Sequence, residues 1–292
     1  MYLPDIELHE ATTLEEAAAA MARYAPHARL LAGGTDLLVD LKTGRVRFGH
    51  LVSINRIEAL RGVKKTRGAL RIGALTTITQ LDRSPIVRER FYPLLDATSQ
   101  MANPQIRNVA TVAGNIVSAV PCADLPPILM VMNASVELWS PGGKRTVPLD
   151  SFFIDVRQTV LRDDEVLTAV LIPNQPEGFG AAYARFSLRD GNTIAVAAVA
   201  AGLMLNSDDT VRDVRITLGA VAPTPKPIES VDDVLVGGHL DEGSLGLVAD
   251  ATMAAAEPIC DVRGSADFRR EIVGVLTRRA LITACHRAKE TK

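Results

Sequence analysis

The stretch Leu30-Leu31-Ala32-Gly33-Gly34-Thr35-Asp36 decides the predicted fold, because a short apolar run ends there in a double-glycine turn. A second turn, Thr111-Val112-Ala113-Gly114-Asn115, follows further along the chain. Glycine allows a backbone to approach a phosphate closely and to adopt positive φ, and the N–H groups of such turns bind anions. One glycine turn is weak evidence, but two of them predict that the protein binds the diphosphate of a dinucleotide.

The composition is that of an ordinary soluble globular protein. At 292 residues the chain is long enough for two or three subdomains, and 47% of its residues are hydrophobic while 23% are charged. The formal net charge is -2, with acidic and basic residues interspersed. This balance argues against nucleic acid or an anionic membrane as a partner.

Three observations predict a reducing, cytoplasmic location. Residues 1–7 lack the basic start and apolar core of a secretion signal. The richest apolar window, residues 194–205, is shorter than the ~18 residues that a membrane-spanning helix requires. Cys122, Cys260 and Cys285 are widely spaced, so they offer no CxxC pair, no metal quartet and no even set for disulfides.

The residues around the first turn are expected to form a small βαβ-like unit. Thr13 and Glu16 form a predicted capping box that opens an alanine-rich helix, and this helix runs to Tyr24. A buried strand, a short helix and a second strand are then expected at residues 29–32, 37–42 and 51–54.

After residue 69 the predicted elements change. We expect strands at residues 70–75 and 166–172, helices at residues 76–81 and 92–101, and a hairpin turn at residues 140–144. Asn103-Pro104 stops the longest of these helices, because proline disfavours helical geometry in the residue before it. The apolar residues 129–138 fit either a strand or a helix.

Composition places the best domain boundary at residues 174–178, Asn-Gln-Pro-Glu-Gly. It divides the chain into domains 1–175 and 176–292, the first with subdomains at about 1–56 and 57–175. In the second domain, a hairpin at residues 194–218 and helices at 244–256 and 266–287 are expected. The predicted fold class is α+β: two α/β subdomains, then an antiparallel sheet with helices.

Each turn also has an interpretation that needs no ligand. Thr35 and Asp36 can cap the following helix, whose N-terminus attracts phosphate, but such caps also occur without a ligand. Thr111 and Asn115 can donate to phosphate oxygens, or they can belong to a plain polar loop. The GxGxxG fingerprint is absent, which argues against the Rossmann mode of dinucleotide binding.

Several motifs together resemble a known family. Residues 106–115, Ile-Arg-Asn-Val-Ala-Thr-Val-Ala-Gly-Asn, and residues 121–127, Pro-Cys-Ala-Asp-Leu-Pro-Pro, closely resemble the FAD-binding subunit of molybdenum hydroxylases. That family includes the flavin components of aerobic carbon monoxide dehydrogenase, xanthine oxidase and 4-hydroxybenzoyl-CoA reductase. Residues 32–36, 72–77 and 151–153 are similar to its other motifs, in the same order. The resemblance runs essentially end to end and implies a FAD-binding domain of the vanillyl-alcohol-oxidase type.

The resemblance implies non-covalent FAD and a role for each matching position. Residues 30–37 would wrap one side of the diphosphate, Asp124 would accept a hydrogen bond from the cofactor, and Val166 and Leu167 would pack on the isoalloxazine. Without the resemblance, Asp124 would be interpreted as a helix N-cap, the apolar residues as core, and Arg185 as a solvated strand charge. The implied cofactor-binding residues are Arg29, Leu30, Leu31, Ala32, Gly33, Gly34, Thr35, Asp36, Leu37, Ala74, Met101, Ala102, Ala110, Thr111, Ala113, Gly114, Asn115, Asp124, Val166, Leu167 and Arg185.

The chain departs from the family pattern at two positions. Ala113 stands where relatives more often have glycine, so we expect its methyl group to weaken binding slightly. The first motif ends in Thr35-Asp36 where some relatives have His-Ser, and no histidine lies in a flavin motif, which argues against a covalent flavin. The cysteine-bearing insert that holds a 4Fe-4S cluster in the 4-hydroxybenzoyl-CoA reductase branch is absent. The sequence assigns no metal ligand and no catalytic acid or base.

The resemblance implies an electron-transfer function in a complex. The chain would pass electrons between the 2Fe-2S clusters of a small subunit and an external acceptor, and a large subunit would carry the molybdenum cofactor, often in a doubled heterotrimer. The cofactors would supply the redox chemistry, while the protein supplies binding and orientation. Two alternatives stay open: a self-contained FAD-dependent oxidoreductase of the same fold, and a non-catalytic binding or assembly protein.

Overall fold

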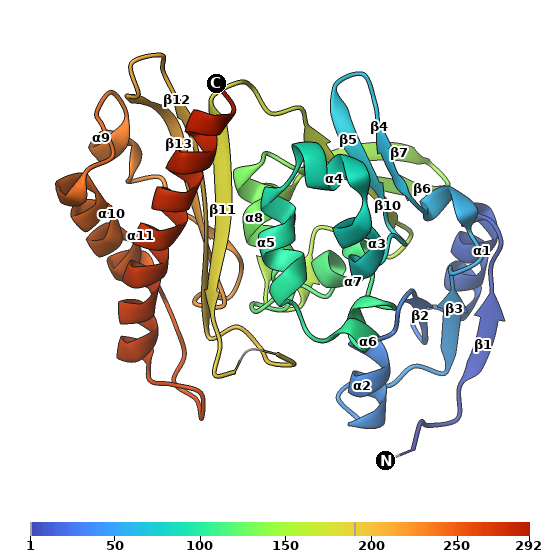
Figure 1. Cartoon of the computed structure of the whole chain (residues 1–292). Coiled ribbons are helices and arrows are strands. Elements are labelled where there is room, and N and C mark those ends of the chain that lie inside the picture. Colours follow the sequence, from blue (N-terminus) through green and yellow to red (C-terminus); the bar gives the residue numbers. More distant parts are fainter. Residues whose placement is uncertain (1, 190) are drawn as a thin grey trace.

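The computed structural model describes residues 2–189 and 191–292, which form three main sheets with helices between and beside them (Figure 1). The first sheet lies at the right of Figure 1 and the C-terminal sheet at the left, with the helices of the middle region between them. Within the described residues, no helix combines the length and the apolar character needed to cross a membrane.

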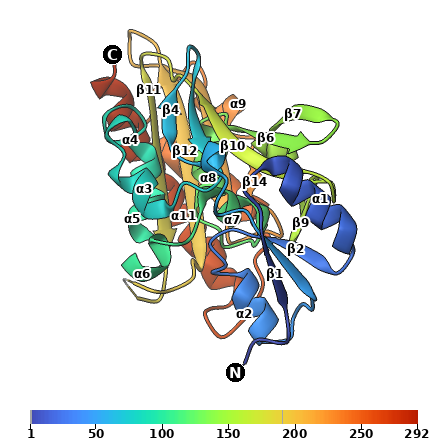
Figure 2. The same cartoon turned by 90° about the vertical axis from the view of Figure 1, so that its right-hand side faces the viewer.

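The first sheet has three parallel strands in the order β1-β3-β2. Its strands and helices are β1 (Glu7–Glu10), α1 (Leu14–Tyr24), β2 (Ala28–Leu31), α2 (Leu37–Lys42) and β3 (His50–Ser53). Figure 2 shows this sheet with α1 and α2 on the side of the molecule that faces the viewer. The βαβ-like unit predicted around the first glycine turn is confirmed.

Helix α1 begins with a single cap, and the predicted capping box is wrong. The Thr13 hydroxyl accepts a hydrogen bond from Glu16 N at 3.1 Å, as predicted. The Glu16 carboxylate, however, accepts two bonds from Thr12, one from its N–H and one from its hydroxyl, each at 2.7 Å. Two donors on one residue hold the carboxylate one position upstream of the cap, so it does not reach the Thr13 N–H.

The second sheet has five strands in the order β4-β5-β10-β6-β7, and all of its pairings are antiparallel. The strands are β4 (Val63–Lys65), β5 (Ala69–Gly73), β6 (Ser135–Ser140), β7 (Gly143–Pro148) and β10 (Val166–Pro173). Short turns join β4 to β5 and β6 to β7, and such turns enforce antiparallel pairing. Ser140 pairs with Gly143, which confirms the predicted hairpin turn.

The segment between β5 and β6 is helical. Its helices are α3 (Ile78–Arg83), α4 (Pro85–Arg90), α5 (Pro93–Gln100), α6 (Pro104–Arg107), α7 (Val112–Val117) and α8 (Leu125–Val131). The apolar run at residues 129–138 is therefore shared between the end of α8 and the start of β6. Four short elements complete this half: η1 (Glu58–Leu60), η2 (Leu149–Ser151), β8 (Phe153–Asp155) and β9 (Gln158–Thr159).

The C-terminal sheet has four antiparallel strands in the order β11-β12-β13-β14. Its strands are β11 (Phe179–Phe186), β12 (Ala197–Leu205), β13 (Val211–Gly219) and β14 (Lys226–Pro227). The helices are α9 (Asp232–Leu235), α10 (Glu242–Ala255) and α11 (Ala266–Glu290). The predicted hairpin and both predicted C-terminal helices are confirmed.

The C-terminal sheet is buried on both faces. Along β11, Ala181 and Tyr183 belong to the apolar core of the N-terminal half, whereas Ala182 and Ala184 belong to the core on the α11 side. This alternation follows from the opposite directions of neighbouring side chains in a strand. A Cβ at Gly180 would lie 2.1 Å from the Ala284 carbonyl oxygen of α11, so glycine is required where helix and strand touch. The division into domains at residue 175 stays a prediction.

Candidate functional site

A cavity of about 310 Å³ lies where the first glycine turn faces helix α7 and the start of β10. Every residue from 29 to 37 lines it, and the opposite wall contains Thr111, Ala113, Gly114, Val166 and Leu167. Its size lies at the lower end of ligand cavities, roughly 300–1,000 Å³. The structure thus brings both glycine turns, which are far apart in the sequence, to one cavity.

The first turn presents unused hydrogen-bond donors. Within the described part of the chain, the backbone N–H groups of residues 33–36 have no hydrogen-bond acceptor. The carbonyl groups of Gly34 and Asp36 do have partners, because they accept bonds from Leu38 N at 3.0 Å and Asp40 N at 2.9 Å. Hydrogen bonds from N–H groups of α2 to carbonyl groups of the turn therefore fix the turn. The turn's own N–H groups stay available to a ligand.

The two glycines of this turn serve the protein's own packing. A Cβ at Gly33 would lie 2.0 Å from the carbonyl oxygen of Val109 and 3.2 Å from the Cα of Ala110. Gly34 has a φ of +72°, a conformation that favours glycine. Contact with the segment just before the second turn is thus a reason for Gly33 that is independent of any phosphate. No local sequence pattern reveals it.

Asp36 does not cap helix α2, so this part of the prediction is wrong. Its backbone is in the right-handed helical region, with φ −96° and ψ −52°, and its side chain makes no cap hydrogen bond. A capping side chain reaches the N–H groups ahead of it only from an extended backbone, which explains the failure. Partial burial, together with the nearby Asp40 carboxylate, raises the pKa of Asp36.

The second turn is satisfied by the protein itself. The Thr111 hydroxyl caps α7 by accepting a hydrogen bond from Gly114 N at 3.1 Å. The N–H groups of Val112 and Ala113 donate to the carbonyl oxygens of Thr76 and Ala74, at 2.9 and 3.2 Å. The side-chain oxygen of Asn115 accepts a bond from Leu125 N at 3.3 Å. What remains for a ligand is the hydroxyl hydrogen of Thr111 and the amide NH₂ of Asn115.

A buried ionic group lies outside the cavity lining. Oδ1 of Asp124 accepts hydrogen bonds from the Tyr183 hydroxyl at 2.7 Å and from Arg185 Nη1 at 2.9 Å. Burial raises the pKa of Asp124, while Arg185 and the Tyr183 hydroxyl act against this rise. Only 2% of the Arg185 side chain is exposed, so it is not a solvated strand charge. Asp124 is not a helix cap, since its side chain makes no cap bond with α8.

The free oxygen of Asp124 is notable for cofactor binding. Both protein donors use Oδ1, and among the described residues no hydrogen bond uses Oδ2. Burial raises the pKa of the nearby Cys122 thiol, and the charges of Asp124 and Asp36 add to this rise. A role for Asp124 and Arg185 in contacting the cofactor stays a prediction.

The remaining predicted residues lie around the cavity without lining it. Ala74 is fully buried under the first turn of α7, and Ala110 binds the start of α3 through its carbonyl oxygen. Met101 is 6% exposed, and its carbonyl oxygen accepts a bond from Arg107. Ala102, with a φ of +46°, accepts a bond from Asn192 N. These four positions stay predictions as cofactor contacts.

Sequence reasoning missed a second set of lining residues: Asp40, Val46, Phe48, Ile54, Val117, Ser118, Arg157 and Leu161. Asp40 is the informative member, because it is 5% exposed and pairs with Arg157 at 2.6 Å and with Arg45. Two guanidinium groups thus stabilise one buried carboxylate at the edge of the cavity. Arg157 comes from the β8–β9 turn with a φ of +60°, and no local pattern connects it to α2.

The wall chemistry fits FAD. Unpaired N–H groups at residues 33–36 suit phosphate oxygens, and the Thr111 hydroxyl adds a neutral donor. Asn115 lies outside the cavity lining, so its contact with the cofactor stays a prediction. Val166 and Leu167 add apolar lining at the start of β10, which suits an aromatic ring system. Donors at one wall and aliphatic side chains at another are the arrangement that a molecule with a diphosphate and a flavin ring requires.

Comparison with known families decides the assignment. A family model described as the FAD binding domain in molybdopterin dehydrogenase matches residues 4–175. The chain belongs to this family. A second model, the CO dehydrogenase flavoprotein C-terminal domain, matches residues 181–284. The protein is therefore the FAD-carrying subunit of an oxidoreductase of the molybdenum hydroxylase class. The α+β fold predicted from the sequence is confirmed as well.

Individual relatives of this family match over almost their whole length. The chain is 36% identical to the carbon monoxide dehydrogenase medium chain of Hydrogenophaga pseudoflava, over 97% of this chain and 98% of that protein. It is 34% identical to a putative xanthine dehydrogenase FAD-binding subunit of Escherichia coli, over 94% of each chain. A solved structure of the Hydrogenophaga carbon monoxide dehydrogenase matches with a TM-score of 0.95 at 35% identity, over 98% of this chain and 99% of that one.

Proposed function

We propose that this subunit binds FAD in the cavity between its two glycine turns and passes electrons between 2Fe-2S clusters of a partner subunit and an external acceptor. The observation that supports this location is the row of unpaired N–H groups at residues 33–36. When bound, FAD supplies a redox centre that accepts electrons singly and releases them in pairs. The chain's own residues bind, orient and shield that centre.

Each wall of the cavity has a separate task in this proposal. The N–H groups of residues 33–36 and the hydroxyl of Thr111 donate to the diphosphate oxygens. Val166 and Leu167 pack on the flavin ring and keep water from one of its faces. Asp124 accepts a hydrogen bond through its unused Oδ2, and Arg185 and Tyr183 hold this carboxylate in place from the other oxygen. The remaining predicted positions, from Ala74 to Ala110, form the support behind these contacts.

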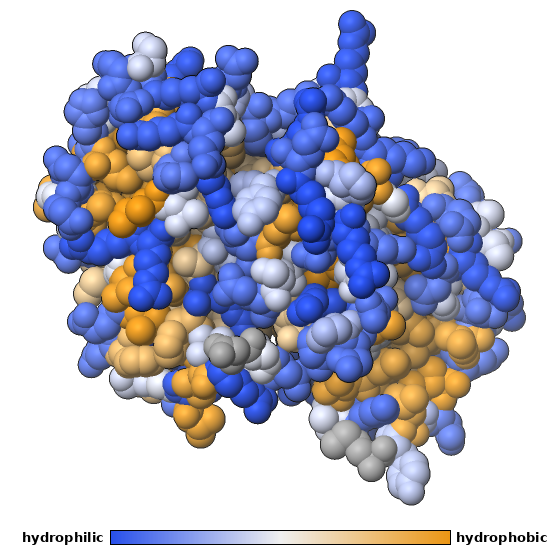
Figure 3. Space-filling view, viewed as in Figure 1, coloured by the Kyte–Doolittle hydropathy of each residue, from blue (hydrophilic) through white to orange (hydrophobic). Residues whose placement is uncertain are grey.

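The proposed partners are a molybdenum-cofactor large subunit and a small subunit with 2Fe-2S clusters, in a heterotrimer that is doubled. The surface supports assembly with other chains. In Figure 3, apolar side chains gather at the lower right, where Figure 1 draws the first sheet and α2. Leu8 of β1 and Val39 of α2 are 56% and 52% exposed. Contiguous apolar surface of this kind is typical of protein interfaces.

Two further proposals complete this function. The subunit works in the cytoplasm, which its scattered cysteines support because all three are free thiols. The FAD-binding domain ends near residue 175, and residues 176–292 form the second domain, whose sheet supplies Tyr183 and Arg185 to Asp124.

A purification tests the proposal. The complex is isolated through a tag on this chain, and its visible spectrum is recorded before and after acid precipitation. We expect flavin released into the supernatant, and two further polypeptides that contain molybdenum and iron. A chain that reduces its own flavin with an organic substrate and no partner would instead indicate a self-contained enzyme. A colourless chain that takes up no FAD would indicate a binding or assembly protein.

Asp124→Asn tests whether the buried ionic group contributes to FAD binding in addition to the cavity walls. The amide keeps the shape but donates where the carboxylate accepted, so we expect FAD retention to fall at least about tenfold. Asp163→Asn, the same substitution at an exposed position before β10, is the control. Unchanged FAD affinity in Asp124→Asn, measured by fluorescence titration of the apoprotein, would restrict Asp124 to a structural role.

A further inference from the structure

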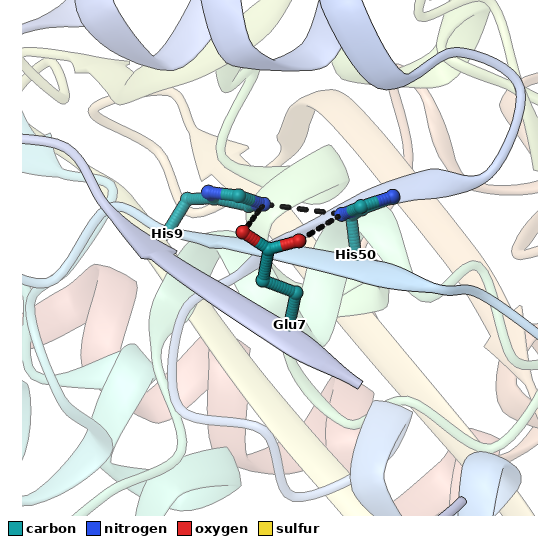
Figure 4. A group of neighbouring side chains, drawn as sticks. All are labelled: Glu7, His9 and His50. Atoms are coloured by element: carbon teal, nitrogen blue, oxygen red, sulfur yellow. Dashed lines mark hydrogen bonds and ion pairs between the residues drawn. The ribbon is translucent and has the colours of Figure 1, made fainter. Parts of the chain in front are cut away.

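Three metal-binding side chains meet on the first sheet, away from the FAD cavity (Figure 4). Glu7 and His9 are two residues apart on β1, so their side chains point to the same face. His50 is the first residue of β3, the neighbouring strand, and it pairs directly with Glu7 in the register of the two parallel strands. The sheet therefore places a carboxylate and two imidazoles together without any contribution from a loop.

The spacing of the three side chains fits one metal ion. Nε2 of His9 lies 3.1 Å from Nδ1 of His50, and the two Glu7 oxygens lie 3.9 Å and 3.5 Å from these nitrogens. Four ligands at the zinc–nitrogen bond length are about 3.3 Å apart in a tetrahedral site. Figure 4 shows the two ring nitrogens and the carboxylate turned toward one another. An ion between them reaches bonding distance from all three with small rotations of the side chains.

The two rings are held in place by an aromatic side chain. Tyr24, at the end of α1, stacks on both imidazoles, with ring centroids 4.5 Å from His9 and 4.0 Å from His50. The histidine side chains are 19% and 25% exposed and that of Glu7 is 64% exposed, so an ion can enter from solvent. The two ring nitrogens lie within hydrogen-bond distance, so without an ion one neutral ring donates its N–H to the lone pair of the other. A cation bound here takes both lone pairs in place of that shared hydrogen. Preorganised rings and an open entry favour a cation.

We propose that Glu7, His9 and His50 form a binding site for one divalent transition-metal ion of the zinc class. Two imidazoles and a carboxylate suit this class, whereas calcium and magnesium prefer oxygen ligands only. At least one coordination position stays open to water, as in sites with three protein ligands. The bound ion links β1 to β3, and β3 is the neighbour of the strand that leads into the first glycine turn. This proposal does not depend on FAD binding.

Equilibrium dialysis against zinc chloride tests the proposal on the full chain after treatment with a chelator. We expect one tightly bound zinc per chain, and an affinity at least about tenfold weaker in His9→Gln and in His50→Gln. His286→Gln is the matched control, because His286 also pairs with a glutamate, Glu290 at 3.3 Å, but has no third ligand among the described residues. Zinc affinity in this control should equal that of the wild type.

A second measurement needs no variant. Zinc that binds the folded chain raises its midpoint of thermal unfolding, and a chelator reverses the rise. No rise in the wild type, or equal zinc affinity in wild type, His9→Gln and His50→Gln, would overturn the proposal and leave a shared proton as the link between the rings. FAD content is measured on the same samples, and we expect it to be unchanged, so failure of the metal site is distinguishable from failure of the FAD site.

Discussion

The two glycine turns face the same cavity but are built in opposite ways. In the first turn, the N–H groups of residues 33–36 have no acceptor within the described structure, and Asp36 provides no cap. In the second turn, Thr111 caps helix α7 and the N–H groups of Val112 and Ala113 bind carbonyl groups next to β5. The first turn therefore presents donors to a ligand, and the second forms a rigid wall. A glycine in the sequence does not show which of these two roles a turn has. The structure shows it, because the N–H groups of one turn have hydrogen-bond acceptors and those of the other do not.

The largest effect is expected from Gly33→Ala, which tests how closely the turns touch. Its Cβ would lie 2.0 Å from the carbonyl oxygen of Val109. The contacted atoms are backbone atoms, which cannot rotate away as a flexible side chain can. We expect the free energy of unfolding to fall by about 3 kcal/mol and FAD to be lost. Urea unfolding and flavin content measure the two effects.

A glycine in open space provides the control for this change. Gly68 lies in the turn between β4 and β5, where an added methyl group would have no heavy atom within 4 Å, and its φ is not positive. We expect Gly68→Ala to be neutral or slightly stabilising, since it restricts only the unfolded chain. If Gly33→Ala were as well tolerated as Gly68→Ala, the two turns would not be in contact.

Gly114→Val is the second-largest change and tests the wall formed by α7. A Cβ there would meet only the Thr111 hydroxyl, at 2.9 Å, and the branches of valine would extend beyond it at the cavity wall. We expect FAD affinity to fall at least about tenfold, about 1.4 kcal/mol. Unlike Gly33→Ala, it should leave the C-terminal domain folded. Full flavin occupancy in this variant would show that the diphosphate does not approach the second turn.

Thr111→Val tests the cap of α7 while it keeps the shape of the side chain at the cavity wall. Valine keeps the shape of threonine but removes the hydroxyl that accepts from Gly114 N, so we expect a loss of about 1 kcal/mol in the free energy of unfolding. Thr111→Ser keeps the hydroxyl and should retain most of the stability. Chemical denaturation of the apoproteins compares the two, and a larger loss in Thr111→Ser than in Thr111→Val would show that threonine contributes through its methyl group and not through the cap.

Asp36→Asn is the smallest change and completes the contrast between the turns. Because the pKa of Asp36 is raised, the folded protein holds its proton more strongly than the unfolded chain does. This contribution is fully present below the pKa of an unfolded aspartate, about 4, and is lost as pH rises through the higher folded pKa. The variant should therefore gain stability relative to wild type between about pH 4 and pH 7, as measured by thermal midpoints. A thermal midpoint below that of the wild type over this pH range would contradict the prediction.

Sequence patterns predicted the elements of this fold well, because those patterns are local. The βαβ-like unit, the hairpin at Ser140 and the two C-terminal helices each depend on neighbouring residues. Caps were less predictable, since the same residue types cap from an extended backbone and fail from a helical one. Thr13 and Thr111 are extended and cap their helices, whereas Asp36 is helical and does not.

The candidate site was predictable only where its residues lie in recognisable motifs. The two turns and the pair at Val166 and Leu167 line the cavity together. Arg157, 117 residues from its partner Asp40, reaches the same wall through a tertiary contact that leaves no local signal. His9 and His50 are likewise 41 residues apart, and only the strand register places them together.

The bond between Asp124 and Arg185 has a consequence for synthesis on the ribosome. The two residues are 61 positions apart, on opposite sides of the proposed domain boundary. At a typical elongation rate the aspartate emerges about 3 to 12 seconds before its arginine. The N-terminal half is made first, but it gains the partner of its buried carboxylate only when β11 arrives. Folding of the two halves is thereby ordered in time, and the cofactor domain is completed last by a strand that lies beyond it in the chain.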